Sequence, residues 1–396
     1  MPNRRDDGYA ARAHTQTGNP MASFCFSFFC LSLALAVFLM PGSVFWPYFA
    51  GMAILDVGLA VKVKKGSQRV KRLDRIVQFG PVFVAIAMAI FGADHLTAAK
   101  FVAMIVPSWM PGKLFWAYFV GFALLAAALS LVTGVKQRLA ASLLGSMIFI
   151  FVLTIHIPVL AGHPFDSTRL TILLRDTLLS ASILAFAASD SWSTAQSSEG
   201  VFSSVTRSIR PKVVSAARFI VAGVMSAFAV SHFIHPMFAP GIPQENVAFF
   251  VTMPSWIPGH AFWAYLVGTI FLGCAVGLLL PKRARLASVV LGLTFLTLTL
   301  VVYLPLTISK AADIADGLNY LAIHFAFAGA ALMLAAGLPA SSSLAESIGE
   351  KRGNEPSHAE AVVTLQSSAT NRKGATGRTA WIVRRISKNH SHSCRA

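Results

Sequence analysis

Charged residues are scarce in this chain of 396 residues. They make up 12% of the sequence, whereas 55% of the residues are hydrophobic, and a soluble domain usually contains about 25% charged residues. This composition argues against a soluble globular fold. Several apolar runs also reach the roughly 20 residues that a helix needs to cross about 30 Å of hydrocarbon, so a membrane is the expected solvent.

Cysteine is also rare, and no two cysteines form a C-x-x-C pair. Cys25 and Cys30 lie in the first apolar run, Cys274 in a later one and Cys394 close to the C-terminus. Thiol–disulfide chemistry on the outer face therefore lacks its reactive groups. The sequence contains no Walker P-loop, no nucleophile elbow and no zinc-protease motif, which argues against ATP-driven transport and hydrolysis.

The apolar runs predict an all-α fold, a polytopic transmembrane helical bundle of about ten spans. The expected spans are residues 21–40, 43–62, 77–97, 113–134, 138–158, 168–188, 215–235, 260–280, 284–306 and 317–337. Helices of this kind satisfy their own backbone hydrogen bonds, which the hydrocarbon cannot do. The lipid bilayer is accordingly the first expected partner.

The net charge of +17 lies mainly in alternate connections between the spans. Basic residues gather at Lys62–Arg75, Lys136–Arg138, Arg207–Lys212 and Lys282–Arg285. The positive-inside rule places these connections in the cytoplasm. We therefore expect a multi-pass protein of the cell inner membrane with both termini cytoplasmic, and no nucleic-acid partner.

The sequence contains an internal repeat. Residues 107–121 (PSWMPGKLFWAYFVG) and 254–268 (PSWIPGHAFWAYLVG) are identical at eleven of fifteen positions. The segment Gly92–His95 has its counterpart in Ala229–His232, and about ten more residues separate this histidine from the repeated motif in the second copy, which predicts a longer outer loop there. Because each copy has four spans, both enter the membrane in the same direction and form a parallel repeat.

This repeat sets the expected domain organisation. We expect a cytoplasmic N-terminal segment at 1–20, a transmembrane helix pair with a basic loop at 21–76, a first four-helix unit at 77–188, a cytoplasmic linker at 189–214, a second four-helix unit at 215–339 and a basic, disordered cytoplasmic tail at 340–396.

The repeated unit resembles the DoxX-like family of integral membrane proteins. The motifs that carry the resemblance are Gly92–His95, Val106–Pro111 and Trp116–Gly121, with His232, Met253–Pro258 and Trp263–Gly268 in the second copy. The resemblance covers about three fifths of the chain and implies two tandem four-helix units. The family includes proteins linked to quinone-coupled sulfur oxidation and to oxidative-stress complexes, but most members have no assigned activity, so it implies a fold more than a function.

Two departures from the pattern distinguish the copies. The second copy has Met253 where the first has Val106, and Tyr303 where the first has His156. We therefore expect unequal sites and favour the first.

Ionisable side chains inside hydrocarbon cost about 2.5–3.5 kcal/mol each, so their positions carry functional hypotheses. We expect all four helices of a unit to be adjacent, so that the polar groups near their outer ends converge in one outward-facing pocket. The candidate pocket residues are Asp94, His95, Trp109, Trp116, Tyr118, His156, Arg175 and Asp176 in the first copy, and His232, Trp256, Trp263, Tyr265, Tyr303 and His324 in the second. Adjacent residues of a helix point about 100° apart, so we expect no direct pair between Arg175 and Asp176.

Two functions stay open, and so does the question whether the protein is an enzyme. Histidine beside a carboxylate can relay a proton or bond to a quinone carbonyl, and aromatic rings can stack on it. This predicts a quinone-linked redox subunit or accessory protein, with quinone or another small redox ligand as cofactor and other membrane subunits as partners. The alternative is a non-enzymatic small-solute carrier or structural subunit, whose polar residues clamp helices together and whose aromatic residues form an interfacial belt. No metal-ligand spacing supports a metal site.

Overall fold

The computed structural model describes residues 54, 72–189, 201–243, 258–309 and 314–339. Within these ranges all regular structure is helical. The elements are α3 (Arg72–Val77), α4 (Gly80–Thr97), α5 (Ala99–Ile105), α6 (Lys113–Thr133), α7 (Gln137–Phe151), the π-helical turn η1 (Val152–His156), α8 (Ile157–Gly162), α9 (Ser167–Ala187), α10 (Val201–Ile234), α11 (His260–Leu279), α12 (Ala284–Leu298), the π-helical turn η3 (Thr299–Tyr303), α13 (Leu304–Ser309) and α14 (Ile314–Gly337).

Eight helical segments are long and apolar enough to cross a membrane, as in a multi-pass membrane protein. These segments are 74–97, 113–133, 137–162, 167–187, 208–234, 260–279, 284–308 and 317–337. They coincide with eight of the spans expected from the sequence to within about four residues at each end, except that the segment 208–234 begins seven residues before the expected span 215–235. The two earlier spans, at 21–40 and 43–62, lie outside the described residues.

A glycine in a left-handed conformation precedes two of these helices. Gly112 precedes α6 and Gly259 precedes α11, with φ angles of 66° and 68°. A residue with a side chain rarely adopts this left-handed conformation. Gly112 turns the chain from the Pro-Ser-Trp-x-Pro motif at 107–111 into α6, and Gly259 turns it from Pro258 into α11.

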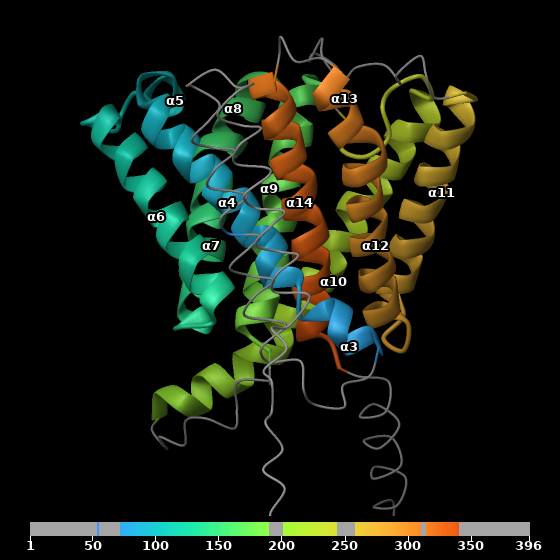
Figure 1. Cartoon of the computed structure of the whole chain (residues 1–396). Helices are drawn as coiled ribbons and strands as arrows, with labels where there is room; N and C mark the ends of the chain where they lie inside the picture. The colour runs from blue at the N-terminus through green and yellow to red at the C-terminus, as the bar shows by residue number, and fades with distance from the viewer. Residues whose placement is uncertain (1–53, 55–71, 190–200, 244–257, 310–313, 340–396) are drawn as a thin grey trace, which may run out of the picture. The chain divides into compact units, whose positions relative to one another are not determined.

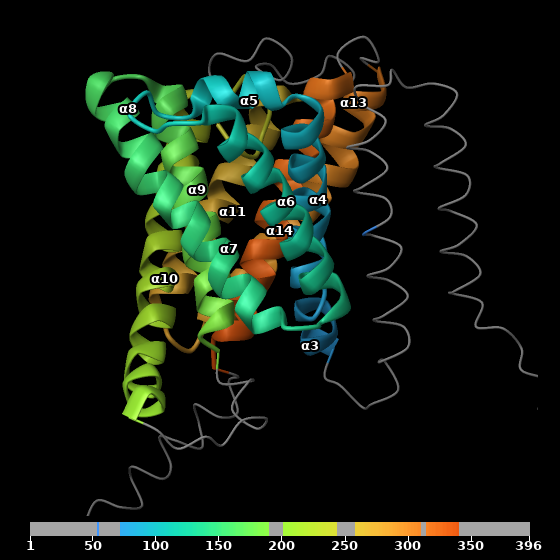
Figure 2. The same cartoon turned by 90° about the vertical axis from the view of Figure 1, so that its left-hand side faces the viewer.

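The helices α4 and α14 occupy the middle of the bundle. In their apolar stretches 72% and 78% of the residues are buried, against 33% in α6 and 22% in the α7–α8 segment. Figures 1 and 2 show α14 packed between neighbouring helices, with α5, α8 and α13 at one end of the bundle, here named the upper end. The poorly buried helices therefore present their apolar surfaces outward, toward the expected lipid.

Helix packing links the first half of the described chain, α4 to α9, with the second half, α10 to α14. α4 packs against α6 and α14, whereas α9 packs against α7, α10 and α14. Helices α4 and α9 do not pack extensively against each other, because α14 lies against both. The expectation that all four helices of the first unit are adjacent is therefore wrong.

The contact between α4 and α14 depends on two glycines. A Cβ atom added to Gly329 would lie 2.6 Å from the carbonyl oxygen of Gly80 and 2.6 Å from the backbone nitrogen of Val84. No side chain fits between the two backbones at this point. Small residues of this kind allow close helix packing inside a membrane, where apolar burial alone does not drive association.

Candidate functional site

A π-helical turn positions His156 at the upper end of the first half. The turn η1 spans Val152–His156, and the backbone N–H of Ile157 donates to the carbonyl of Val152. Pro158 follows two residues after His156. Its ring lacks an N–H group and would clash with the carbonyl of Thr154 in a regular α-helix, so the wider turn accommodates it. The local sequence thereby directs the His156 imidazole toward α9.

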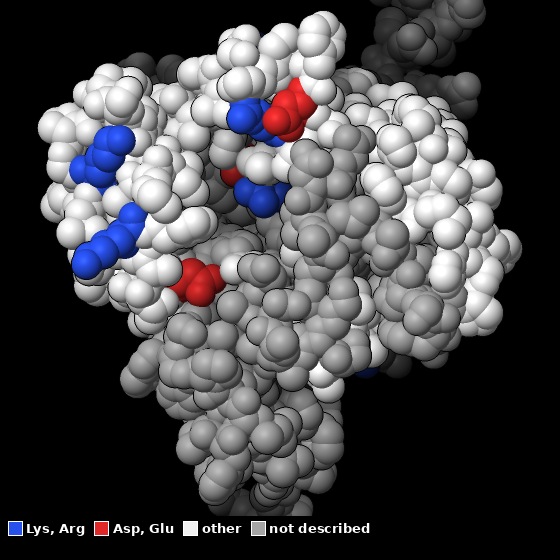
Figure 3. Space-filling view, turned by 90° about the horizontal axis from the view of Figure 1, so that it is seen from above, with Lys and Arg blue, Asp and Glu red and all other residues white. Residues whose placement is uncertain are grey.

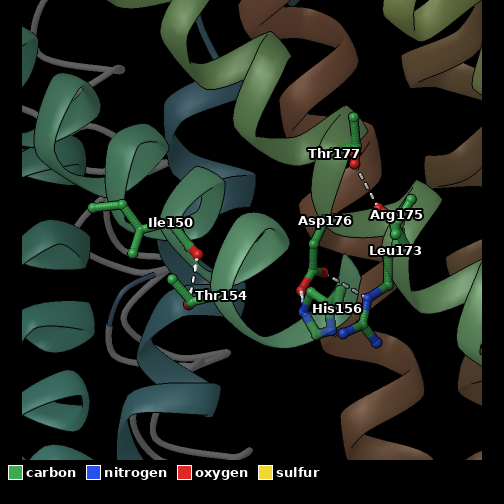
Figure 4. Close-up of polar contacts among 7 residues, drawn as sticks. All are labelled: Ile150, Thr154, His156, Leu173, Arg175, Asp176 and Thr177. Carbon is green, nitrogen blue, oxygen red and sulfur yellow. Dashed lines mark hydrogen bonds and ion pairs between the residues drawn. The ribbon is translucent and has the colours of Figure 1, made fainter. Parts of the chain in front are cut away.

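His156, Arg175 and Asp176 form a polar cluster between η1 and α9 (Figure 4). The Nε2 atom of His156 lies 2.8 Å from Oδ2 of Asp176. The Nε atom of Arg175 lies 2.8 Å from Oδ1 of the same carboxylate. Each carboxylate oxygen thus has one charged or chargeable partner, which gives a short, charge-assisted contact on both sides.

The direct ion pair between Arg175 and Asp176 corrects an expectation from the sequence. Neighbouring positions on a helix do point in different directions, but the long arginine side chain folds back to reach the carboxylate. Arg175 consequently pairs with Asp176, and among the described residues no hydrogen bond or ion pair of the Asp94 side chain is found.

The cluster remains partly open to its surroundings. The side chains of His156, Arg175 and Asp176 are 17%, 25% and 14% exposed. Seen from the upper end, acidic and basic atoms lie in a hollow between the helices as well as on its rim (Figure 3). The apolar helices therefore do not fully enclose the polar groups of the cluster.

The hydrogen bonds of the cluster leave specific atoms available. With Asp176 ionised, Nε2 of His156 carries the proton of their hydrogen bond, so Nδ1 is left as an acceptor. Two nearby hydroxyls do not compete for the carboxylate: Thr154 donates to Ile150 and Thr177 donates to Leu173 (Figure 4). The site thus combines an imidazole nitrogen that has no hydrogen-bond partner among the described residues with a carboxylate that can stabilise the protonated ring.

His95 and Asp94 lie apart from this cluster on α4. The Nδ1 atom of His95 lies 2.7 Å from the carbonyl oxygen of Phe91, one turn earlier. A Cβ added to Gly121 of α6 would lie 2.9 Å from the Cβ of His95, so the two helices are in close contact here. Among the described residues, no bond joins His95 or Asp94 to the His156 cluster.

A second group, in the second half, is buried. His232, Tyr303 and His324 are 5%, 2% and 0% exposed. The rings of Tyr303 and His324 stack with their centroids 3.8 Å apart and an interplanar angle of 29°. The segment Ala239–Pro243, also buried, covers these side chains.

The aromatic candidates lie mostly on the outside. Trp109, Tyr118 and Tyr265 are 68%, 42% and 45% exposed. The indole N–H groups of Trp116 and Trp263 donate to the carbonyls of the nearby prolines 111 and 258, at 3.0 and 2.9 Å. These bonds hold the turn before each helix, and the outward positions agree with an interfacial belt. Trp256 lies outside the described residues.

The described residues contain no group of three or more His, Cys, Asp or Glu side chains arranged to hold a metal ion. The chain matches no protein-family model, no curated protein and no solved structure. The site is therefore interpreted from its own geometry.

The sequence did not predict that the segment Ala239–Pro243 covers His232, Tyr303 and His324. The signal was present, because the second copy has about ten additional residues with prolines at 236, 240 and 243. These residues predict a longer loop, but the pattern does not say that the loop turns inward and contacts the buried histidines. That result depends on packing between segments distant in sequence.

Proposed function

We propose that residues 77–188 and 215–339 are two copies of one DoxX-like four-helix unit. The recurring geometry supports this proposal. Both π turns, η1 and η3, end two residues before a proline, Pro158 or Pro305. Arg138 near the start of α7 donates to the carbonyl of Ala187 at 3.0 Å, and Arg285 near the start of α12 donates to that of Ala335 at 3.2 Å.

This correspondence aligns the two polar groups. His156 and Tyr303 both end a π turn. The carbonyl acceptors of the two arginines, Ala187 and Ala335, lie 148 residues apart, and the same offset pairs Asp176 with His324. The first half has an ion-paired, partly exposed site, while its counterpart is aromatic and buried. The asymmetry makes the first half the better candidate for ligand binding.

We infer that the first half binds a quinone-like ligand at its upper end and handles the ligand's proton. The observation that carries this inference is the contact of His156 with Asp176 in a partly open site between apolar helices. A hydroxyl of a reduced ligand can donate to Nδ1 of His156, and transfer of that proton would give an imidazolium ion that the Asp176 carboxylate stabilises. A carbonyl of an oxidised ligand can accept a hydrogen bond from the same ring once it is protonated. The chain then acts as a redox subunit or accessory protein whose electrons are exchanged with a partner subunit in the inner membrane.

A structural role is the second candidate, and one observation favours it. Both oxygens of Asp176 already have partners, so the cluster joins η1 to α9 without any ligand. Removing one member of such a partly buried group leaves an unbalanced charge and destabilises the fold. A purely structural cluster would show this loss of stability and no ligand-specific effect.

The two roles are separated by extracting bound small molecules from the purified protein. The variants are His156→Ala and Asp176→Asn, with Thr154→Ala as the control on the same π turn, because its hydroxyl bonds only to the Ile150 carbonyl in the cluster region. Quinone retained by wild type and the control but lost from folded variants supports the binding site. Wild-type protein without ligand, together with variants of reduced stability, favours the structural role.

A further inference from the structure

One peptide group of the chain is held from both sides inside the second half. The Tyr303 hydroxyl donates to the carbonyl oxygen of Pro240 at 2.9 Å. The N–H of Gly241, which belongs to the same Pro240–Gly241 peptide group, donates to Nε2 of His232 at 2.9 Å. A planar group with one acceptor and one donor is therefore clamped between two side chains from α10 and η3.

The wall behind this peptide group is aromatic and polar. His324 stacks on Tyr303, and its Nδ1 lies 2.8 Å from the carbonyl oxygen of Tyr320. Its other nitrogen, Nε2, is buried and has no hydrogen-bond partner among the residues that the structure describes. A buried polar atom without a partner is energetically unfavourable, and the peptide segment that packs here does not satisfy this nitrogen. A ligand able to donate a hydrogen bond would satisfy this atom better.

Glycine is required where the segment meets this wall. Gly241 has a φ angle of 131°. A Cβ at this position would lie 2.6 Å from Nε2 of His324 and 3.3 Å from the Tyr303 hydroxyl. Both the backbone conformation and the space therefore exclude a larger residue while the segment is in place.

The first half has no equivalent segment. After His95 the chain continues from α4 into α5 with one intervening residue, Ala98. The residues that correspond to Tyr303 and His324 are the partly exposed His156 and Asp176. The position that a peptide group fills in the second half is thus left accessible in the first.

We propose that the second half contains a ligand site of the same kind as the first, which the chain fills with its own Pro240–Gly241 peptide group. Its external ligand would be a small planar ring with a hydroxyl group, such as a hydroquinone, because a hydroxyl can accept from Tyr303 and donate to Nε2 of His324. The ligand oxygen would accept the Tyr303 hydroxyl proton in a hydrogen bond, and its ring would lie where the peptide plane lies. This ligand class rests on the proposed function, whereas the contacts that fill the site do not.

The test uses Gly241→Ala in the full-length protein and duroquinol, kept reduced under anaerobic conditions, as the probe. The added methyl group displaces the peptide group, so equilibrium dialysis in detergent should give about two equivalents of bound probe against about one for wild type. Adding Tyr303→Phe should remove the second equivalent, and adding His156→Ala should remove only the first. A folded Gly241→Ala protein with the wild-type stoichiometry would overturn the proposal.

Hydrogen exchange of wild type provides a second measurement if Gly241→Ala does not fold. The Gly241 amide is protected by His232, and excess duroquinol competing for the site should accelerate its exchange in a concentration-dependent way. The acceleration should be absent in Tyr303→Phe. No acceleration in wild type contradicts the self-filled site. Failure of the proposed function looks different: wild type then binds no probe, while Gly241→Ala still binds one equivalent.

Discussion

Arg175 and Asp176 are neighbours in the sequence whose side chains form an ion pair, with 2.8 Å between Nε and Oδ1. Replacing Arg175 with glutamine removes the positive charge and leaves Asp176 with His156 as its remaining partner. We expect the free energy of unfolding to fall by about 1.5–3 kcal/mol, the range for a hydrogen bond that involves charged groups. Thermal or denaturant unfolding in detergent measures the change.

Arg169→Gln is the matched control for this substitution. Arg169 pairs with Asp166 at 3.2 Å, but both side chains are about a third exposed, at 34% and 30%. Such surface pairs contribute about 0–1 kcal/mol, so the control should unfold almost like wild type. Equal losses in the two variants would contradict a special role for the Asp176 cluster.

The contact between α4 and α14 gives a second prediction. Gly329→Ala places a methyl group 2.6 Å from two backbone atoms, the Gly80 oxygen and the Val84 nitrogen, which cannot move aside like a flexible side chain. We expect a loss of about 1–3 kcal/mol from overpacking. Gly223→Ala in α10 meets nothing within 4 Å, so it should be neutral or slightly stabilising. If melting temperatures of the two variants match, the close helix approach is wrong.

Much of the fold could be predicted because apolar run length is a local property. The last eight expected spans agree with eight helical segments of the structure. The π turns η1 and η3, which interrupt two of these segments, were harder to predict. Pro158 and Pro305 mark the places, but whether a proline kinks, ends or widens a helix depends on the neighbouring helices.

The site was less predictable because it depends on contacts between distant segments. His156 and Asp176 were both candidates and do meet, since both lie near the upper ends of helices that pack together. His95 was expected in the same pocket, yet α4 packs on α14 and α6 rather than along α9. Residue depth can be read from the sequence, whereas the order of helices around the bundle cannot.

The orientation in the membrane is a third prediction. Lys136 and Lys282 lie in connections at the end of the bundle opposite to α5 and α8, and Lys100 lies in α5. By the positive-inside rule the lysine-rich end faces the cytoplasm. In a variant without the native cysteines, Lys136→Cys should resist a membrane-impermeant thiol reagent in intact cells and react after lysis. Lys100→Cys should react in intact cells, and the reverse pattern would contradict the proposed orientation.

The π turn before Pro158 gives the last prediction. Alanine at this position restores the missing N–H and removes the ring, so the turn can close into a regular α-helix. A π turn contains one residue more than an α turn, so its conversion into a regular α-helix rotates His156 by about 100° around the helix axis. The imidazole would then leave Asp176 although both residues are still present.

Pro158→Ala should therefore weaken quinone retention about tenfold or more, the consequence of losing about 1.4 kcal/mol of binding free energy. Pro305→Ala is the matched control, because it alters the corresponding turn before Tyr303 in the second half and leaves the first site intact. Equilibrium dialysis with the same probe measures both, and circular dichroism verifies their helical content. If both variants bind like wild type, the π turn does not position the ligand-binding imidazole. If only Pro158→Ala loses the ligand, the position of His156 rather than its mere presence determines binding.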